Sequence, residues 1–117
     1  MQEQNQTTIN IPIGKWNIFG NLEEGDLDIS SVDSNGNLNG TAFGSPIKGF
    51  YHADLGQIHF SRVMGIDRFQ TFDGYISIIR INVDAPDYLL AGSYVTYTSG
   101  LQSRPKLAWY ALKREVL

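Results

Sequence analysis

Two histidines are the side chains of this sequence that are best suited to chemistry. His52 and His59 lie on either side of a turn at Gly56, so paired strands would bring their imidazoles to one face. With Asp54 they offer the nitrogen and carboxylate ligands of a metal site. His52, Asp54 and Ser61 also have the residue types of a hydrolytic triad. Neither set has the spacing of a known motif, so we interpret both histidines as parts of an exposed hairpin.

The carboxylates and glycines give no clearer sign of catalysis. Asp26 and Asp28 could act as an acid–base pair, but their alternation beside Glu23 and Glu24 indicates the solvent face of a strand. The glycines are spread among turns and form no phosphate-binding G-x-x-x-x-G-K run. The absence of cysteine excludes disulfides and thiolate chemistry. We therefore expect no enzymatic activity, no metal and no cofactor.

Large aromatic residues with a few amides nearby suggest binding instead. Ligand pockets are mostly apolar, with few polar groups that orient the ligand. The candidate ligand-binding residues are Trp16, Asn17, Asn21, Phe60, Gln70, Phe72, Tyr94 and Trp109. The simpler interpretation of the aromatic members is that they fill the interior of the fold, since each such side chain buries about 150–250 Å².

Size and charge limit the kind of protein. The 117 residues suffice for one core, and the net charge of −3 argues against a nucleic-acid partner. No apolar run approaches the roughly 20 residues of a membrane-spanning helix. We expect residues 1–10 to be a disordered polar tail and residues 11–117 to be a single β-barrel domain. No signal peptide is visible, so the cytoplasm is the default location, with a processed secreted chain as the alternative.

Short β-branched and aromatic segments, separated by Gly, Asn, Asp and Pro, predict strands along the whole chain. The strongest turn signal is Asp33-Ser34-Asn35-Gly36-Asn37. The predicted strands are residues 16–19, 27–32, 38–43, 47–53, 58–63, 72–83, 88–98 and 106–113, with a loop at 64–68 and a break at 84–87. Eight strands joined by hairpins can close into an antiparallel up-and-down β-barrel, which holds its own side chains or one small ligand. The expected fold class is therefore all-β.

Several short segments resemble the avidin/streptavidin family. They are Gly14-Lys15-Trp16, residues 27–32 with the turn at Ser34-Asn35-Gly36, Gly40-Thr41, Ser45-Pro46-Ile47-Lys48-Gly49, Phe72-Asp73-Gly74 and Trp109-Tyr110-Ala111. The resemblance implies a calycin-type eight-stranded barrel with a ligand cup. It also implies that the tryptophan of the last strand reaches into the cavity of a neighbouring subunit.

The polar residues that hold the ureido oxygen of biotin in that family are not retained. Ile18 stands at the asparagine position, Leu22 near the serine position and Ala42 at the tyrosine position. The loop that closes over biotin shrinks to Gly44-Ser45. Each buried ligand oxygen left without a donor costs about 1–3 kcal/mol. The resemblance therefore implies an apolar cup, and we do not expect it to bind biotin.

Two functions follow from these observations. The first is a non-enzymatic barrel that binds a small hydrophobic ligand. It would assemble as a homo-oligomer, a dimer or tetramer, because residues 75–81 carry apolar side chains on both faces. The second is a protein-interaction or inhibitor barrel with a filled interior, in which the loops 64–68 and 99–105 carry recognition. An open cup favours the first function, and an interior packed shut favours the second.

Overall fold

The computed structural model describes residues 8–82 and 85–114, and all regular structure in this part of the chain is β-strand. The strands are β1 (Gly14–Gly20), β2 (Glu23–Val32), β3 (Asn37–Ala42), β4 (Ser45–His52), β5 (Gln57–Val63), β6 (Arg68–Asn82), β7 (Ala85–Thr98), β8 (Leu101–Gln102) and β9 (Leu107–Arg114).

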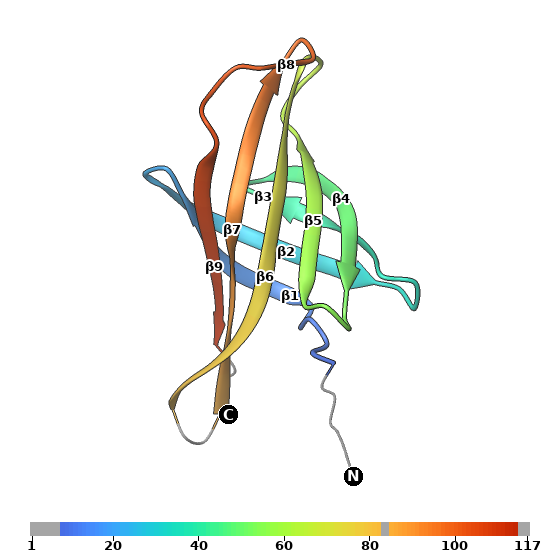
Figure 1. Cartoon of the computed structure of the whole chain (residues 1–117), viewed down its shortest axis with the longest axis vertical. Coiled ribbons are helices and arrows are strands. Elements are labelled where there is room, and N and C mark those ends of the chain that lie inside the picture. The colour runs from blue at the N-terminus through green and yellow to red at the C-terminus, as the bar shows by residue number, and fades with distance from the viewer. Residues whose placement is uncertain (1–7, 83–84, 115–117) are drawn as a thin grey trace.

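Eight of these strands close into one antiparallel barrel, as the sequence predicts. Each strand from β1 to β7 pairs with the next, and β9 pairs with both β7 and β1. Strands β6, β7 and β9 run along the long axis of the molecule, and β1 and β2 cross behind them (Figure 1). Because the ring is closed, each of the eight strands pairs with a neighbour on both sides.

The short strand β8 and the length of β6 and β7 differ from the prediction. The turn Ser99-Gly100, with φ angles of 52° and 80°, folds the chain back so that β8 pairs with the end of β7. Arg68 was predicted in a loop, but it begins β6 and pairs with Thr98. The predicted break at 84–87 is also shorter, because β7 begins at Ala85. The pairing of β6 with β7 therefore extends from Arg68–Thr98 to Asn82–Ala85, with a shift of register between Ile79 and Asn82.

One end of the barrel, here called the floor, is closed by the segment before β1. Trp16 is fully buried there, and its indole nitrogen donates a hydrogen bond to the carbonyl oxygen of Pro12 at 3.1 Å. The hydroxyl of Tyr51 donates to the carbonyl oxygen of Ile9. Residues 1–7 of the predicted tail lie outside the described residues, whereas residues 8–10 run along the floor. The opposite end, where β1–β2, β3–β4 and β5–β6 connect, is called the mouth.

Candidate ligand site at the barrel mouth

A stack of aromatic rings fills the middle of the barrel. Phe60, Phe72 and Tyr94 are paired across β5, β6 and β7 and point inward. The ring centroids lie 4.7 Å apart between Phe60 and Phe72 and 5.0 Å apart between Phe72 and Tyr94, with nearly parallel planes. Trp109 meets the face of this stack edge-on, 5.6 Å from Phe72. These predicted ligand-binding residues therefore pack against one another, and the interior is filled.

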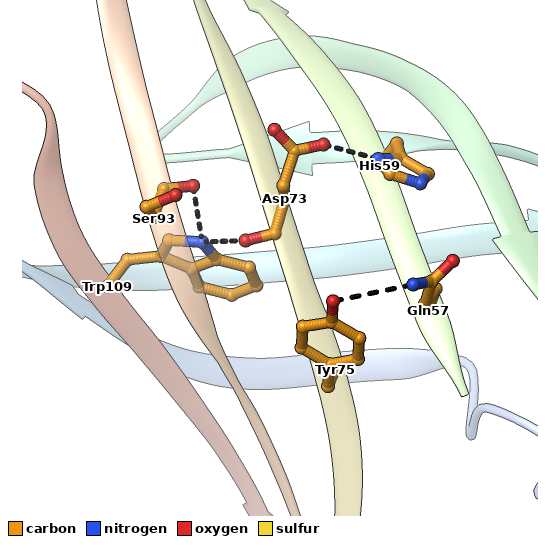
Figure 2. Close-up of polar contacts among 6 residues, drawn as sticks. All are labelled: Gln57, His59, Asp73, Tyr75, Ser93 and Trp109. Carbon is orange, nitrogen blue, oxygen red and sulfur yellow. Dashed lines mark hydrogen bonds and ion pairs between the residues drawn. The ribbon is translucent and has the colours of Figure 1, made fainter. Parts of the chain in front are cut away.

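Trp109 is anchored inside its own barrel. Its indole nitrogen donates to the carbonyl oxygens of Asp73 and Ser93, each at 3.1 Å (Figure 2). Gly74 makes room for the indole, because a Cβ atom at that position would lie 2.8 Å from the ring. The resemblance implied that this tryptophan serves a neighbouring subunit, but the structure buries it to 2% exposure within one chain.

A layer of polar side chains covers the aromatic stack on the side of the mouth. Arg62, Gln70 and Thr96 are paired across the same three strands. Nη1 of Arg62 donates to Oε1 of Gln70 at 3.0 Å, and Nε2 of Gln70 donates to Oγ1 of Thr96 at 3.1 Å. Gln70 and Thr96 are buried, so their mutual hydrogen bond satisfies groups that water does not reach. The chain of hydrogen bonds holds the guanidinium of Arg62 in place.

Phe43 closes the mouth over Arg62. Its ring lies above the guanidinium, 5.0 Å from its central carbon, and its carbonyl oxygen accepts a hydrogen bond from Nη2 at 3.4 Å. Phe43 adopts a φ angle of 50°, which is uncommon for a bulky residue. Gly25 provides space for the ring, since a Cβ atom there would lie 2.5 Å from it. Phe43 thus forms a lid made of one side chain in a two-residue turn.

The guanidinium of Arg62 is incompletely paired. Its Nε atom is buried and has no hydrogen-bond partner. The two ion pairs formed by the described residues join Lys15 to Asp26 and His59 to Asp73, so no described carboxylate pairs with Arg62. Burial lowers the pKa of Arg62, because the surroundings disfavour its charged form.

Charged groups of both signs surround the mouth. The carboxylate of Glu23 raises the pKa of Arg62, and the guanidinium of Arg68 lowers it, both by less than burial does. Burial also raises the pKa of Tyr94, on which Arg104 acts as a further nearby cation. Arg62 and Glu23 thus line the mouth, Arg68 and Arg104 act on it from nearby, and Asp67 lies in the β5–β6 loop at the same end of the barrel.

Little empty space is left between these groups. The cavity at the mouth has a volume of about 10 Å³, and its lining residues are Gly20, Glu23, Phe43, Arg62, Gln70, Phe72, Tyr94 and Trp109. A cavity needs roughly 10–15 Å³ to hold one water molecule. A larger molecule fits only when the lid moves, and Phe43 is the lining residue that sits in a turn and not in a strand.

The structure brings some of the predicted site residues together and separates others. Gln70, Phe72, Tyr94 and Trp109 line the mouth cavity, and Phe60 stacks just beneath it. The other three predicted residues lie elsewhere: Trp16 at the floor, Asn17 on the outer surface with its amide on Glu24 at 3.2 Å, and Asn21 in the exposed β1–β2 turn. Those three positions are unsuited to a common site.

Four lining residues of the mouth are absent from the predicted site: Gly20, Glu23, Phe43 and Arg62, of which Arg62 and Phe43 are central to the site. The sequence does predict the direction of Arg62, because this residue follows the inward-facing Ile58 and Phe60 at alternating positions of the same strand. The sequence predicts Phe43 as the last residue of the strand 38–43, but β3 ends at Ala42 and Phe43 lies in the turn, where alternation along the strand no longer fixes its side. Its role follows only from where the turn places its ring.

The histidines lie on the outer surface of the barrel. The rings of His52 and His59 are 5.9 Å apart. Nδ1 of His59 contacts the carboxylate of Asp73 (Figure 2), whereas the metal-site hypothesis requires a metal shared with Asp54. Within residues 8–82 and 85–114, no three His, Asp or Glu side chains are grouped closely enough to hold a metal ion. His59 is exposed, in agreement with the hairpin interpretation.

A larger groove of about 580 Å³ lies at the floor, between the first described residues and the β2–β3 and β4–β5 turns. The carboxylate of Asp33 borders this groove, but it already accepts hydrogen bonds from the backbone nitrogens of Asn35 and Asn37, both at 2.9 Å. The groove is open to solvent, and this acidic side chain stabilises its own turn. It is a weaker candidate than the mouth.

Comparison of the chain with protein-family models, curated proteins and solved structures gives no match. The resemblance to the avidin/streptavidin family stays a prediction. Among the described residues, no helix is long and apolar enough to cross a membrane.

Proposed function

We propose that this barrel is a non-enzymatic binding protein that takes a small molecule at its mouth, in contact with Arg62. The observation that carries the proposal is the buried Nε atom without a partner, on a guanidinium that forms no ion pair with a described carboxylate. Removing a cation from water without a counter-charge destabilises a fold. Such groups are concentrated at functional sites, where a ligand supplies the missing partner.

The filled interior changes where the predicted ligand would bind. The sequence suggested a hydrophobic ligand deep inside a cup, but the aromatic stack occupies that volume. At the mouth, the buried rings of Phe72, Tyr94 and Trp109 line the small cavity and supply its apolar wall, and Arg62 supplies the orienting polar group. Few polar groups against an apolar wall are typical of small-molecule sites.

A thermal-shift screen of small molecules on the wild type and on Arg62→Gln tests this proposal. A compound present at a hundred times its dissociation constant should stabilise the wild type by about 2.7 kcal/mol. We expect such compounds to lose their effect on Arg62→Gln and to keep it on the matched control Arg114→Gln, which removes an exposed charge from the end of β9. We expect no shift with biotin. If every stabilising compound acts equally on Arg62→Gln, the site is not at the mouth.

The filled interior and the loops beside β6 and β7 favour a second candidate function, protein interaction. Val63, Ile66 and Leu101 are exposed by 53%, 102% and 74%, and the nitrogen of Ser99 donates to the carbonyl oxygen of Asp67 at 2.8 Å, which joins the two loops. Exposed aliphatic side chains that gather at one end of a protein are typical of contact surfaces. We propose a second copy of this chain as the partner; the sequence also predicts a homo-oligomer, but from the apolar residues 75–81 and not from these loops.

Light scattering at several concentrations tests the second candidate. We expect the wild type to have the mass of a dimer or tetramer of the 13.1 kDa chain, and Ile66→Ser to shift it towards the monomer. Leu22→Ser is the matched control, because Leu22 is equally exposed in the separate β1–β2 turn. A wild type that stays monomeric at all concentrations contradicts this candidate.

A further inference from the structure

We propose that the ligand of the mouth is a small molecule with a carboxylate attached to a flat ring. We also propose that Phe43 occupies the position of this ligand when the site is empty. The inference rests on the proposed function of the mouth and names the chemical class that it would bind. Phe43 already presents the two features of such a ligand to Arg62. Its ring covers the guanidinium face, and its carbonyl oxygen meets Nη2.

The free edge of the guanidinium has the geometry that a carboxylate requires. Nε and Nη2 lie on one edge of the planar group, and two parallel N–H donors bind the two oxygens of a carboxylate. Nη1 is already used by Gln70 at 3.0 Å. On the remaining edge, Nε has no partner, and the bond from Nη2 to Phe43 is long at 3.4 Å. A carboxylate oxygen on each of these nitrogens would complete the hydrogen bonding of Arg62.

The charged residues that line the cavity are one cation, Arg62, and one anion, Glu23. Glu23 is exposed, so water screens its repulsion of a bound anion more than it screens the buried edge of Arg62. Arg68 and Arg104 are further cations close enough to act on the groups of the mouth. An anion on the buried edge of Arg62 is therefore favoured over a cation.

Displacement of the Phe43 ring would open the site without disturbing the barrel. Phe43 and Gly44 form the two-residue turn between β3 and β4, with φ angles of 50° and 78°. A Cβ atom at Gly44 would meet nothing within 4 Å, so the outer side of this turn is unobstructed. A flat ring of the ligand could then take the position above the guanidinium and regain the cation–π contact that Phe43 gives up.

Calorimetric titration with benzoate and with its uncharged counterpart benzamide tests the inference on three proteins. The wild type should bind benzoate at least roughly tenfold more tightly than benzamide, the worth of one charge-assisted hydrogen bond. Phe43→Gly should bind benzoate more tightly still, because the competing ring is absent and glycine suits the positive φ angle. Arg62→Lys keeps the charge but loses the paired donors, so it should lose most of the preference for benzoate.

Circular dichroism confirms the fold of each variant, and Arg114→Lys serves as the matched control at an exposed position. Equal binding of benzamide and benzoate by the wild type, unchanged in Arg62→Lys, overturns the carboxylate assignment. Benzoate binding that Phe43→Gly does not strengthen overturns the place-holding role of Phe43. If neither compound binds the wild type or Phe43→Gly, while other molecules still require Arg62 in the thermal-shift screen, only this inference fails. If no molecule requires Arg62, both proposals fail.

Discussion

At the scale of single residues, glycines decide where the large rings lie. A Cβ atom at Gly49 would lie 2.5 Å from Cβ of Phe60, and one at Gly92 would overlap the carbonyl oxygen of Asp73. Gly74 leaves space for the indole of Trp109 in the same way. Glycine in the middle of a strand weakens it, but here it allows a close approach between neighbours that no larger residue permits.

Gly92→Ala should therefore destabilise the barrel by about 1–3 kcal/mol or more, because the added methyl group meets backbone that cannot move aside. Gly65→Ala is the matched control, since a Cβ atom there meets nothing within 4 Å. Urea denaturation measures both free energies of unfolding. Equal effects of the two substitutions would show that the packing around Gly92 is looser than the structure indicates.

The sequence predicts which residues face inward better than it predicts what they do together. Alternation places Phe60, Phe72 and Trp109 on one side of their strands, and these residues are buried. The same alternation applies to Arg62, but a basic residue in a strand is ordinarily exposed, and its burial depends on the neighbouring strands. Whether the rings fill the barrel or line a cup depends on how the stack forms across β5, β6 and β7, which spacing along the chain does not specify.

At the scale of elements, the tight turns explain how the strands are joined and where local strain lies. Asn21 and Leu22 form a turn with φ angles of 44° and 71°, the conformation for which hairpins favour Asn-Gly. Leu22 is fully exposed there and buries none of its apolar surface. The side chain therefore contributes nothing to the core while its backbone is held in a conformation that disfavours it.

Leu22→Gly should stabilise the protein by about 1 kcal/mol, since relief of the left-handed strain outweighs the greater freedom that glycine gives the unfolded chain. Gly44→Ala changes the corresponding position of the β3–β4 turn, with a φ angle of 78°, and should have the opposite effect. Chemical denaturation of both variants checks the signs. A loss of stability in Leu22→Gly would mean that Leu22 contacts something in solution.

The β2–β3 turn should make stability depend on pH. The side-chain amide of Asn37 is the main cause that lowers the pKa of Asp33 below its ordinary 3.8, assisted by backbone N–H donors. A lowered pKa means that the contribution of the carboxylate is present above the ordinary value and is lost as the pH falls through the folded value. The free energy of unfolding of Asp33→Asn should therefore differ from that of the wild type more at neutral pH than at about pH 2.

Denaturation curves of both proteins at the two pH values measure this difference. Lys48→Gln, on the exposed side of β4, controls for a change of one charge elsewhere on the barrel. A difference between Asp33→Asn and the wild type that is the same at both pH values contradicts the role of the carboxylate in the turn.

At the scale of the whole molecule, the barrel has two different ends. The floor is closed by apolar packing around Trp16, whereas the mouth is closed by one side chain, Phe43, over a charged group. The sequence predicts the closed ring because its turn signals and alternation agree along most of the chain. It does not predict this asymmetry, because the segment before β1 and the β3–β4 turn are placed by contacts with distant strands.

The most direct test of the mouth as a binding site is the NMR signal of the Nε–H group of Arg62, assigned by comparison with Arg62→Lys, during a titration with benzoate. We predict that this signal moves progressively and saturates, because the ligand supplies the acceptor that the buried Nε lacks. A signal that stays in place at saturating benzoate, while signals elsewhere on the barrel move, would contradict the central claim.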